Sequence, residues 1–319
     1  MGLIQKVCIG LFLFAFALPV SALAQDNFSG LKLTPAIHNL TAEPGTVVQG
    51  SLIISNDTNQ AITLDATVHD FATVDEYHTH RYLPVTPTNG NLSIRQWTIL
   101  ALNELDPDFS DQTLKSRPQL NGLIVPANGQ LTVYYHIKIP IDTIGGGRYG
   151  SVRFTSSDIT NLELGNEIYI RVTGQITDKG EVSDFKPVSW FNIKQPVMVN
   201  SVFSNFGSSH LIPTGRVVIS NMFNRSVSTL TYNGTDHILL PNDRDHLSVR
   251  WNSGPIWSRF GLYKARLELT FPGTDAIPIT TQTTFFLFPI VWLIMVPVII
   301  FVIWILIKYF RKPRPKKKK

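Results

Sequence analysis

The sequence predicts an all-β fold: two tandem immunoglobulin-like β-sandwich domains followed by one transmembrane α-helix. Three observations predict it. Apolar and polar residues alternate with period two along much of the chain, and turn-forming residues separate these stretches. Near the C-terminus, 23 consecutive residues carry no charge. Since half-buried strands alternate in this way and a membrane span needs about 20 apolar residues, strands come first and a helix last.

The N-terminal segment 1–24 is expected to be a signal peptide. Lys6 precedes the apolar run Ile9–Val20, and the small residues around Ala24 fit a cleavage site. The only cysteine of the chain, Cys8, lies before this run. The exported chain therefore has no disulfides, which is typical of a bacterial surface protein of this size.

Residues 25–178 are predicted to form the first sandwich. In the stretch Ala61–His69, alternate residues point inward, namely Ile62, Leu64, Ala66 and Val68. The stretch Leu131–Ile139 alternates in the same way and places Tyr135 on its inner face. One helical turn would fit within residues 94–105, but a strand over Gln96–Leu100 is the preferred interpretation.

Residues 179–284 are predicted to form a second sandwich, because the first half of the chain is echoed there. The passages Gly50–Leu64 and Gly215–Leu230 share a glycine, an aliphatic run and a Ser-Asn step. We expect Ser-Asn to satisfy backbone groups where a buried strand turns. The repeat therefore predicts shared structure and no chemistry of its own.

A Gly-x-Tyr step also occurs in both halves, at Tyr149 and Tyr263. Each tyrosine opens an alternating strand, as in the tyrosine corner of immunoglobulin-like sandwiches. We expect both rings to be buried in their own domains, with hydroxyls bonded to nearby backbone.

Residues 285–307 are predicted to be the transmembrane helix, and the basic tail 308–319 follows it. The positive-inside rule then places the tail in the cytoplasm and the sandwiches outside, as in a single-pass type I protein of the cell membrane. Removing the eight basic residues of the tail and Lys6 from the formal charge of +5 leaves −4 for the exported part. The basic pI therefore comes from the tail that follows the predicted membrane helix, and no nucleic-acid partner is expected.

The passages "TPAIHNLTAEPGTVVQGSLIISNDTNQAITLDATVHDF", "VPANGQLTVYYHIKIP" and "GGGRYGSVRF" resemble the DUF916-type domain of WxL-interacting bacterial cell-surface proteins. The second half, including "PTGRVVISNMFN" and "FGLYKARLEL", is similar to the companion domain of related surface proteins. The resemblance implies contact with peptidoglycan, a surface protein or a host ligand.

The one dense cluster of polar side chains is the stretch 69–82, where His78 and His80 would share one face of an extended strand with carboxylates nearby. The members of this cluster are His69, Asp70, Asp75, Glu76, His78 and His80. A metal site is one interpretation, and a solvated hairpin is the favoured one. Gly145–Gly147 lacks the Lys-Ser/Thr of a phosphate loop, and no Gly-x-Ser-x-Gly motif occurs. We therefore expect no catalytic, cofactor-binding or metal-binding residues, no cofactor and no enzymatic activity. The remaining histidines are expected at the surface: His38, His136, His210, His237 and His246.

Two classes of function remain. In the first, the chain is a membrane-anchored surface protein whose sandwiches contact envelope glycan, such as peptidoglycan, or a protein partner. In the second, it is a structural or chaperone-like subunit of an envelope assembly that pairs by β-strand addition. An exposed aromatic surface would favour the first class, and an open, uncharged edge strand the second. The segment Val85–Gly122 is a weak candidate for a recognition element, and a connecting segment with no role in recognition is the favoured interpretation.

Overall fold

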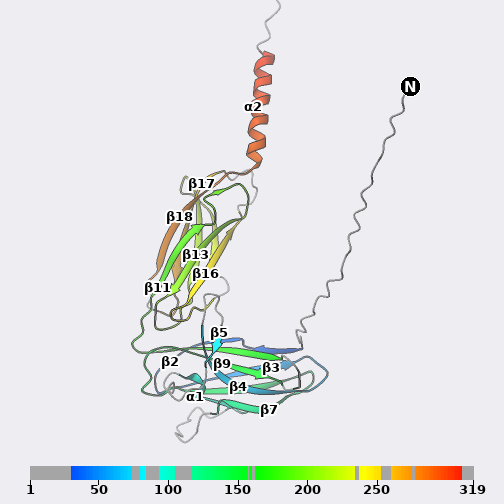
Figure 1. Cartoon of the computed structure of the whole chain (residues 1–319), viewed down its shortest axis with the longest axis vertical. Helices are drawn as coiled ribbons and strands as arrows, with labels where there is room; N and C mark the ends of the chain where they lie inside the picture. Colours follow the sequence, from blue (N-terminus) through cyan, green and yellow to red (C-terminus); the bar gives the residue numbers. More distant parts are fainter. Residues whose placement is uncertain are drawn as a thin grey trace, which may run out of the picture.

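The computed structural model describes residues 30–73, 80–83, 93–104, 117–156, 158–159, 162–233, 237–252, 260–274 and 277–310. The predicted signal peptide 1–24 and residues 311–319 of the basic tail lie outside this range. Two groups of β-sheets follow one another along the chain, and a single long helix leaves the second group (Figure 1). The predicted fold class is confirmed.

Domain one comprises strands β1 to β10, packed as two sheets. One sheet has the order β1-β3-β8-β6, with bounds Leu31–Thr34, Val47–Asn56, Gly129–Lys138 and Thr98–Ala101. The other has the order β2-β10-β9-β4-β5, with bounds Ile37–Ala42, Glu163–Val172, Gly146–Thr155, Ile62–Thr73 and His80–Tyr82. Strand β7, Gln119–Val125, also pairs with β4.

Domain two comprises strands β11 to β18. Its smaller sheet has the order β11-β13-β16, with bounds Gly180–Pro187, Val197–Asn205 and Arg244–Trp251. Its larger sheet has the order β12-β18-β17-β14-β15, with bounds Phe191–Asn192, Ile279–Leu287, Gly261–Thr270, Thr214–Asn221 and Ser226–Tyr232. Domain one ends with β10 at Val172, and β11 begins at Gly180.

The two domains share one strand topology. In each, the first strand (β1 or β11) pairs antiparallel in one sheet, and the short second strand (β2 or β12) pairs parallel with the last strand of the other sheet. Strands β3, β4, β8, β9 and β10 thereby correspond to β13, β14, β16, β17 and β18. The inference of a tandem duplication is thus correct at the level of topology.

The repeated passage itself, however, occupies different strands in the two domains. Gly50–Leu64 connects β3 to β4, and thus joins two sheets, whereas Gly215–Leu230 is a hairpin of β14 and β15 within one sheet. The counterpart of β3 is β13, which ends at Asn205. An aliphatic strand ends in Ser-Asn once in domain one, at β3, and twice in domain two, at β13 and β14, so the sequence pattern matched β3 with the wrong one of the two.

Asn56 and Asn205 confirm this correspondence, because both are buried and cap their strands alike. Asn56 Nδ2 donates to the carbonyl oxygens of Gln60 at 2.8 Å and Pro126 at 3.0 Å. Asn205 Nδ2 donates to those of Ser209 at 2.9 Å and Leu239 at 2.8 Å. As expected, the Asn side chain forms hydrogen bonds with backbone groups of the turn at the ends of β3 and β13.

Each domain has its own apolar core. The inward residues predicted for β4 are buried, and so are those of β8 apart from the half-buried Leu131; Tyr135 is 1% exposed. In domain two, alternate residues of β17 are buried in the same way, including Leu267 at 0%. Trp251 and Tyr263 pack with ring centroids 4.9 Å apart, and Phe285 stacks on Tyr263 at 5.8 Å. Tyr263 therefore has the buried ring expected of it, in the core of domain two.

Two local predictions need correction. Ile94–Trp97 is a helical turn, α1, and the strand after it begins at Thr98 rather than at Gln96. Ser93 caps this turn by accepting from the Gln96 amide, a local interaction that strand periodicity does not reveal.

The long helix α2 is Val291–Phe310, rather than the predicted 285–307. Phe285 and Leu287 belong to β18 and are fully buried in domain two. Because an apolar strand runs almost directly into an apolar helix, hydropathy could not locate the boundary. By length and composition, α2 is the one helix among the described residues that is long and apolar enough to cross a membrane.

Candidate interaction surfaces

The two domains meet through the loop that follows β13. The Gly147 amide donates to the Ser208 carbonyl oxygen at 2.9 Å, and the Ser208 amide donates to the Thr177 carbonyl oxygen at 2.8 Å. His210 Nε2 lies 2.9 Å from Asn39 Oδ1 on β2. Since an amide oxygen can only accept, Nε2 carries the proton in this bond. Backbone and side chains thus join the domains directly.

An aromatic cluster fills the same junction. Phe71 and Tyr169 of domain one pack with Leu240 of domain two. The rings of Tyr149 and Tyr169 each lie 5.7 Å from the His210 ring, measured between centroids. This arrangement links the two domains through desolvated rings.

Tyr149 therefore has a different role from the one predicted. Its ring belongs to the junction rather than to the core of domain one, and Ser209 and the His210 backbone approach its hydroxyl. Burial raises the pKa of Tyr149, and the approach of these groups opposes that rise. The Gly-x-Tyr pattern could not distinguish a tyrosine of the junction from one of a core.

His210 and His136 were expected at the surface and are buried, at 4% and 3% exposure. Burial lowers the pKa of His210 to about 4; the charge of Arg171 lowers it further, and that of Asp178 opposes. Burial also lowers the pKa of His136, and the charge of Glu104 opposes. Glu104 and His136 line the same small hollow beside β8. Strand alternation along β8 does not predict that His136 is buried.

A polar cleft of about 420 Å³ opens between the domains. Its lining includes Thr41 and Arg171 of domain one and Thr274 of domain two. The Arg171 guanidinium donates to both carboxylate oxygens of Asp178, one of them at 2.9 Å. Because Asp178 already neutralises this cation, the cleft offers hydroxyl groups rather than a net charge to a ligand.

Other sequence candidates fall largely outside the described residues. His78 lies outside them, and His80 begins β5 opposite Thr73. Among the described residues no group of three His, Cys, Asp or Glu side chains is placed to hold a metal ion. Of the segment Val85–Gly122, the structure describes α1, β6 and most of β7, which are packed parts of domain one.

The edge strands of domain two differ in how they discourage pairing with another chain. Strand β11 carries Glu181, Asp184 and Lys186, and Asp184 has a positive φ of 54° where the register shifts. Strand β16 carries Arg244 and Arg250 among its eight residues. Charges and irregularities of this kind are the usual protection of an edge.

Strand β15 lacks these protections. Its seven residues, SVSTLTY, include no charge, proline or glycine, and β-branched residues suit an extended chain. It pairs with β14 over Gly215–Tyr232, and no other described strand pairs with it. Thr229 and Thr231 are exposed. An extended segment of another protein could therefore add to this edge.

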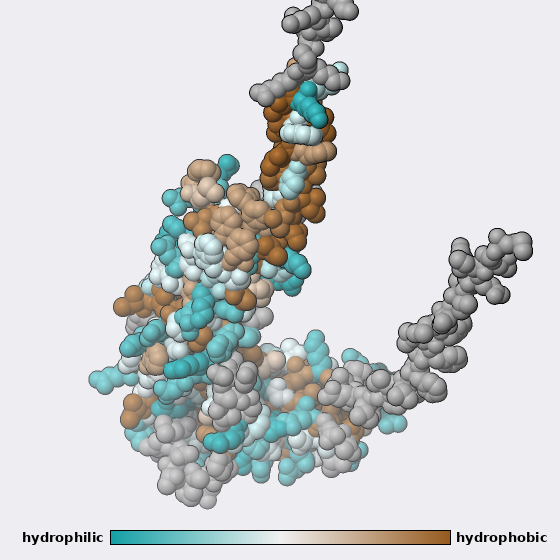
Figure 2. All heavy atoms as spheres, turned by 45° about the horizontal axis from the view of Figure 1, so that its top comes forward, coloured by the Kyte–Doolittle hydropathy of each residue, from teal (hydrophilic) through white to brown (hydrophobic). Residues whose placement is uncertain are grey.

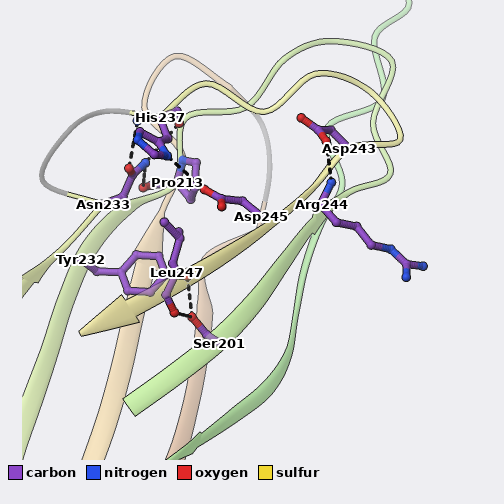
Figure 3. A network of polar contacts seen from close by, with 9 residues as sticks. All are labelled: Ser201, Pro213, Tyr232, Asn233, His237, Asp243, Arg244, Asp245 and Leu247. Carbon is purple, nitrogen blue, oxygen red and sulfur yellow. Dashed lines mark hydrogen bonds and ion pairs between the residues drawn. The ribbon is translucent and has the colours of Figure 1, made fainter. Parts of the chain in front are cut away.

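Polar contacts fix the far end of β15 (Figure 3). The Tyr232 hydroxyl lies 2.9 Å from Ser201 Oγ, which donates to the Leu247 carbonyl oxygen at 3.2 Å. Asn233 Nδ2 donates to the Pro213 carbonyl oxygen at 2.9 Å. These bonds tie β15 to neighbouring elements, so the edge is formed before any partner arrives.

A second exposed surface lies where domain two meets α2. We call it the helix-proximal cluster: Trp190, Phe191, Phe260, Leu262, Phe286 and Phe288. Figure 2 shows apolar atoms continuing from the helix onto the adjoining end of domain two. Trp190 is 59% exposed and Phe260 49%. The sequence analysis did not find this cluster, because its members come from three separate segments.

No protein-family model matches the chain, and no curated protein matches it either. Solved structures with a similar arrangement include a chain from a chaperone–tip adhesin complex of CFA/I fimbriae biogenesis, with 9% identity, a TM-score of 0.38, and coverage of 80% of this chain and 99% of that one. The class 5 fimbriae chaperone CfaA has 8% identity and a TM-score of 0.37, and the match covers 80% of this chain and 99% of that one.

A chain of the CsuC–CsuE chaperone–tip adhesion subunit pre-assembly complex of Acinetobacter baumannii gives 8% identity, a TM-score of 0.37, and coverage of 82% of this chain and 100% of that one. At this level the likeness concerns the arrangement of strands. The function must therefore be argued from the surfaces of this chain.

Proposed function

We propose that the chain is a membrane-anchored, non-enzymatic subunit that holds an extended segment of another protein along β15 by strand addition. This is the structural or chaperone-like class of function considered from the sequence. The open, uncharged edge of β15 carries the proposal, because strand addition needs a row of backbone donors and acceptors that no charge or proline blocks. In this proposal α2 spans the cell membrane, with the sandwiches on the extracellular side.

The rigidity of β15 supports the same proposal. An added strand gains affinity from main-chain hydrogen bonds only if the template is already ordered. The contacts of Tyr232 and Asn233 supply that order at one end, and pairing with β14 supplies it along the length. Specificity would come from the pockets between alternating side chains of β15.

The test is a pair of substitutions on the exposed face of β15, Thr229→Lys and Thr231→Lys. A lysine on an edge strand discourages pairing, but at an exposed position it changes stability by only about 0.5 kcal/mol. Thr155→Lys is the matched control, because Thr155 is equally exposed but lies on β9, paired on both sides by β4 and β10.

Photo-crosslinking from position 229 in intact cells would identify the partner. We expect crosslinks to one extended peptide of one protein, their loss in Thr231→Lys, and their persistence in Thr155→Lys. Crosslinks that survive Thr231→Lys, or that also form from Arg266 on the paired strand β17, would refute strand addition at this edge.

The surface-binding class of function keeps one observation in its favour, the aromatic helix-proximal cluster. Aromatic rings can stack on glycan, and the resemblance to WxL-interacting proteins remains a prediction. The position of the cluster beside α2 favours an occupant other than glycan.

A further inference from the structure

The helix-proximal cluster is a built surface rather than a set of stray apolar side chains. The Phe191 and Phe286 rings stack with centroids 5.8 Å apart and planes inclined by 7°, and Trp190 stacks on Phe286 at 6.1 Å. The Phe260 ring meets those of Phe286 and Phe288 edge-on, at 5.5 Å and 5.4 Å. Rings from β12, β18 and the residues adjoining them, together with Phe260 just before β17, thus form one continuous apolar face.

Backbone hydrogen bonds hold this face in place. The Phe286 amide donates to the Trp190 carbonyl oxygen and the Phe288 amide to that of Asn192, both at 2.7 Å. Leu262 lies opposite Phe286 in the β17–β18 register. Phe191, Leu262 and Phe286 therefore lie in paired strands, and backbone hydrogen bonds hold Trp190 and Phe288 next to them.

The hairpin between β14 and β15 adds a second apolar feature at the same end. Asn221 at the end of β14 lies opposite Tyr263, one residue after Leu262. Met222 packs on Gly261, where a Cβ atom would come within 2.5 Å of Met222 Cε. Phe223 at the hairpin tip is 81% exposed. The tip therefore projects an aromatic ring beside the cluster.

The short connection to α2 sets the distance from this end to a membrane. The helix has 20 residues, so at about 1.5 Å per residue it is about 30 Å long, the thickness of a hydrocarbon core. Phe288 is still bonded to domain two, and Val291 begins the helix. Three Cα steps of at most ~3.8 Å separate Phe288 from Val291, so Phe288 lies within about 11 Å of the first residue of the helix.

We propose that the helix-proximal cluster and Phe223 insert into the headgroup region of the same bilayer that α2 crosses. A headgroup layer is about 5–7 Å thick on each side, comparable to the reach of the connection. Aromatic residues are enriched in this layer because their rings suit its mixed polarity. The proposal rests on the anchoring part of the proposed function and not on strand addition.

The charges around the cluster agree with this occupant. The segments 188–194, 220–226, 260–264 and 284–290 contain no acidic residue. Lys194 and Arg225 are exposed beside the apolar surface. Each basic residue near an anionic membrane surface contributes about 1 kcal/mol of attraction. An apolar face whose own segments, as the structure describes them, carry basic residues and no acidic ones suits a lipid surface with anionic headgroups.

The test uses nitroxide labels on the full chain, reconstituted into vesicles of phosphatidylcholine with phosphatidylglycerol. Cys8→Ser removes the only cysteine, and labels are then placed singly at Phe191→Cys and Phe223→Cys. Ile141→Cys, whose side chain is 85% exposed in domain one, is the control for water, and Ile299→Cys within α2 is the control for lipid. Collision with oxygen and with a water-soluble nickel chelate reports the surroundings of each label.

We expect labels 191 and 223 to lose most of their collisions with nickel and to gain collisions with oxygen, as label 299 does, while label 141 stays open to nickel. The Thr229→Lys variant should behave identically, which separates this result from strand addition. If labels 191 and 223 collide with nickel as often as label 141 does, while label 299 is shielded, the inference is overturned. The anchoring proposal would then still stand.

Two other outcomes would also overturn the inference. If label 299 is open to nickel, α2 does not span the bilayer, and the anchoring proposal fails as well. If labels 191 and 223 become shielded only when peptidoglycan fragments are added, the cluster binds glycan rather than lipid.

Discussion

The two domains have the same strand order but treat their edges differently. In domain one, β2 pairs with β10 over six residues, and domain two supports β2 through the bond of Asn39 to His210. In domain two, β12 pairs with β18 over two residues only, and β11 of the other sheet lies beside the remainder. One topology thus supports the last strand of the two domains to different extents.

Both proposed contact surfaces lie in domain two. Domain two carries the uncharged edge of β15 at one side and the helix-proximal cluster at the end next to α2. Domain one contributes its last strand and its tyrosines to the junction. A duplicated sandwich can therefore specialise by changes at edges and ends, while its core pattern stays constant.

The largest expected effect comes from truncating a core ring in either domain. Trp251→Ala in domain two and Phe154→Ala in domain one should each cost ~3–5 kcal/mol. Hydrogen exchange of the full chain in detergent micelles, measured peptide by peptide, should show a larger loss of amide protection in the mutated domain than in the other. A uniform loss in both domains would mean that the junction makes them one cooperative unit.

Acid should weaken the junction through His210. Its pKa in the folded chain, about 4, lies below the value of about 6.5 for an unfolded chain, so the unfolded chain takes up the proton first as pH falls. The contribution of His210 is therefore complete above pH 6.5, and it is lost progressively towards pH 4. Between pH 7 and pH 5 we expect a loss of about 2 kcal/mol.

Urea unfolding of the full chain in micelles at the two pH values measures this loss. His210→Gln keeps a donor for Asn39 but cannot titrate, so it should remove about 2 kcal/mol of the pH dependence. Burial also lowers the pKa values of His38, His69 and His136 in domain one, and these should account for much of what remains. An unchanged pH dependence in the variant would show that His210 is not buried in its neutral form.

The structural equivalence of Asn56 and Asn205 predicts matched losses. Asn56→Ala and Asn205→Ala each leave buried carbonyl oxygens unpaired, which should cost about 1–3 kcal/mol. Asn221→Ala, at the position that the repeated passage would equate with Asn56, should cost less, because Asn221 caps an exposed turn. Equal losses at Asn56 and Asn221, with none at Asn205, would favour the sequence alignment over the strand topology.

The smallest expected effect concerns the last strand of each domain. Because β12 covers so little of β18, amides in Ile279–Thr284 should exchange faster than amides in Glu167–Val172 of β10, which lie between two hydrogen-bonded strands. Hydrogen exchange under native conditions tests this directly. Equal protection would show that β11 shields β18 as well as a paired strand would.

Local pattern was sufficient for several features. Period-two alternation identified the buried faces of β4, β8 and β17, and a run without charges identified the helix. These predictions succeeded because burial of alternate residues depends on neighbours along the same strand. The start of the helix could not be found in this way, since Phe285 and Val291 are equally apolar.

The features that depend on contacts distant in sequence were not available from the pattern. Tyr149 and His210 lie in different domains, and their rings meet only when the domains dock. Strand β15 is an edge because of the order in which strands pair, and the helix-proximal cluster joins rings from segments that begin near residues 190, 260 and 286.

The sequence by itself determined that this chain forms strands with apolar inner faces and ends in an apolar helix, since both properties follow from the spacing of side chains along the backbone. The tertiary structure decided which Ser-Asn steps are equivalent, which tyrosine belongs to a core, and which edge stays open. These outcomes depend on which strands become neighbours, and that choice reflects packing and hydrogen bonding across the whole domain rather than any local stretch.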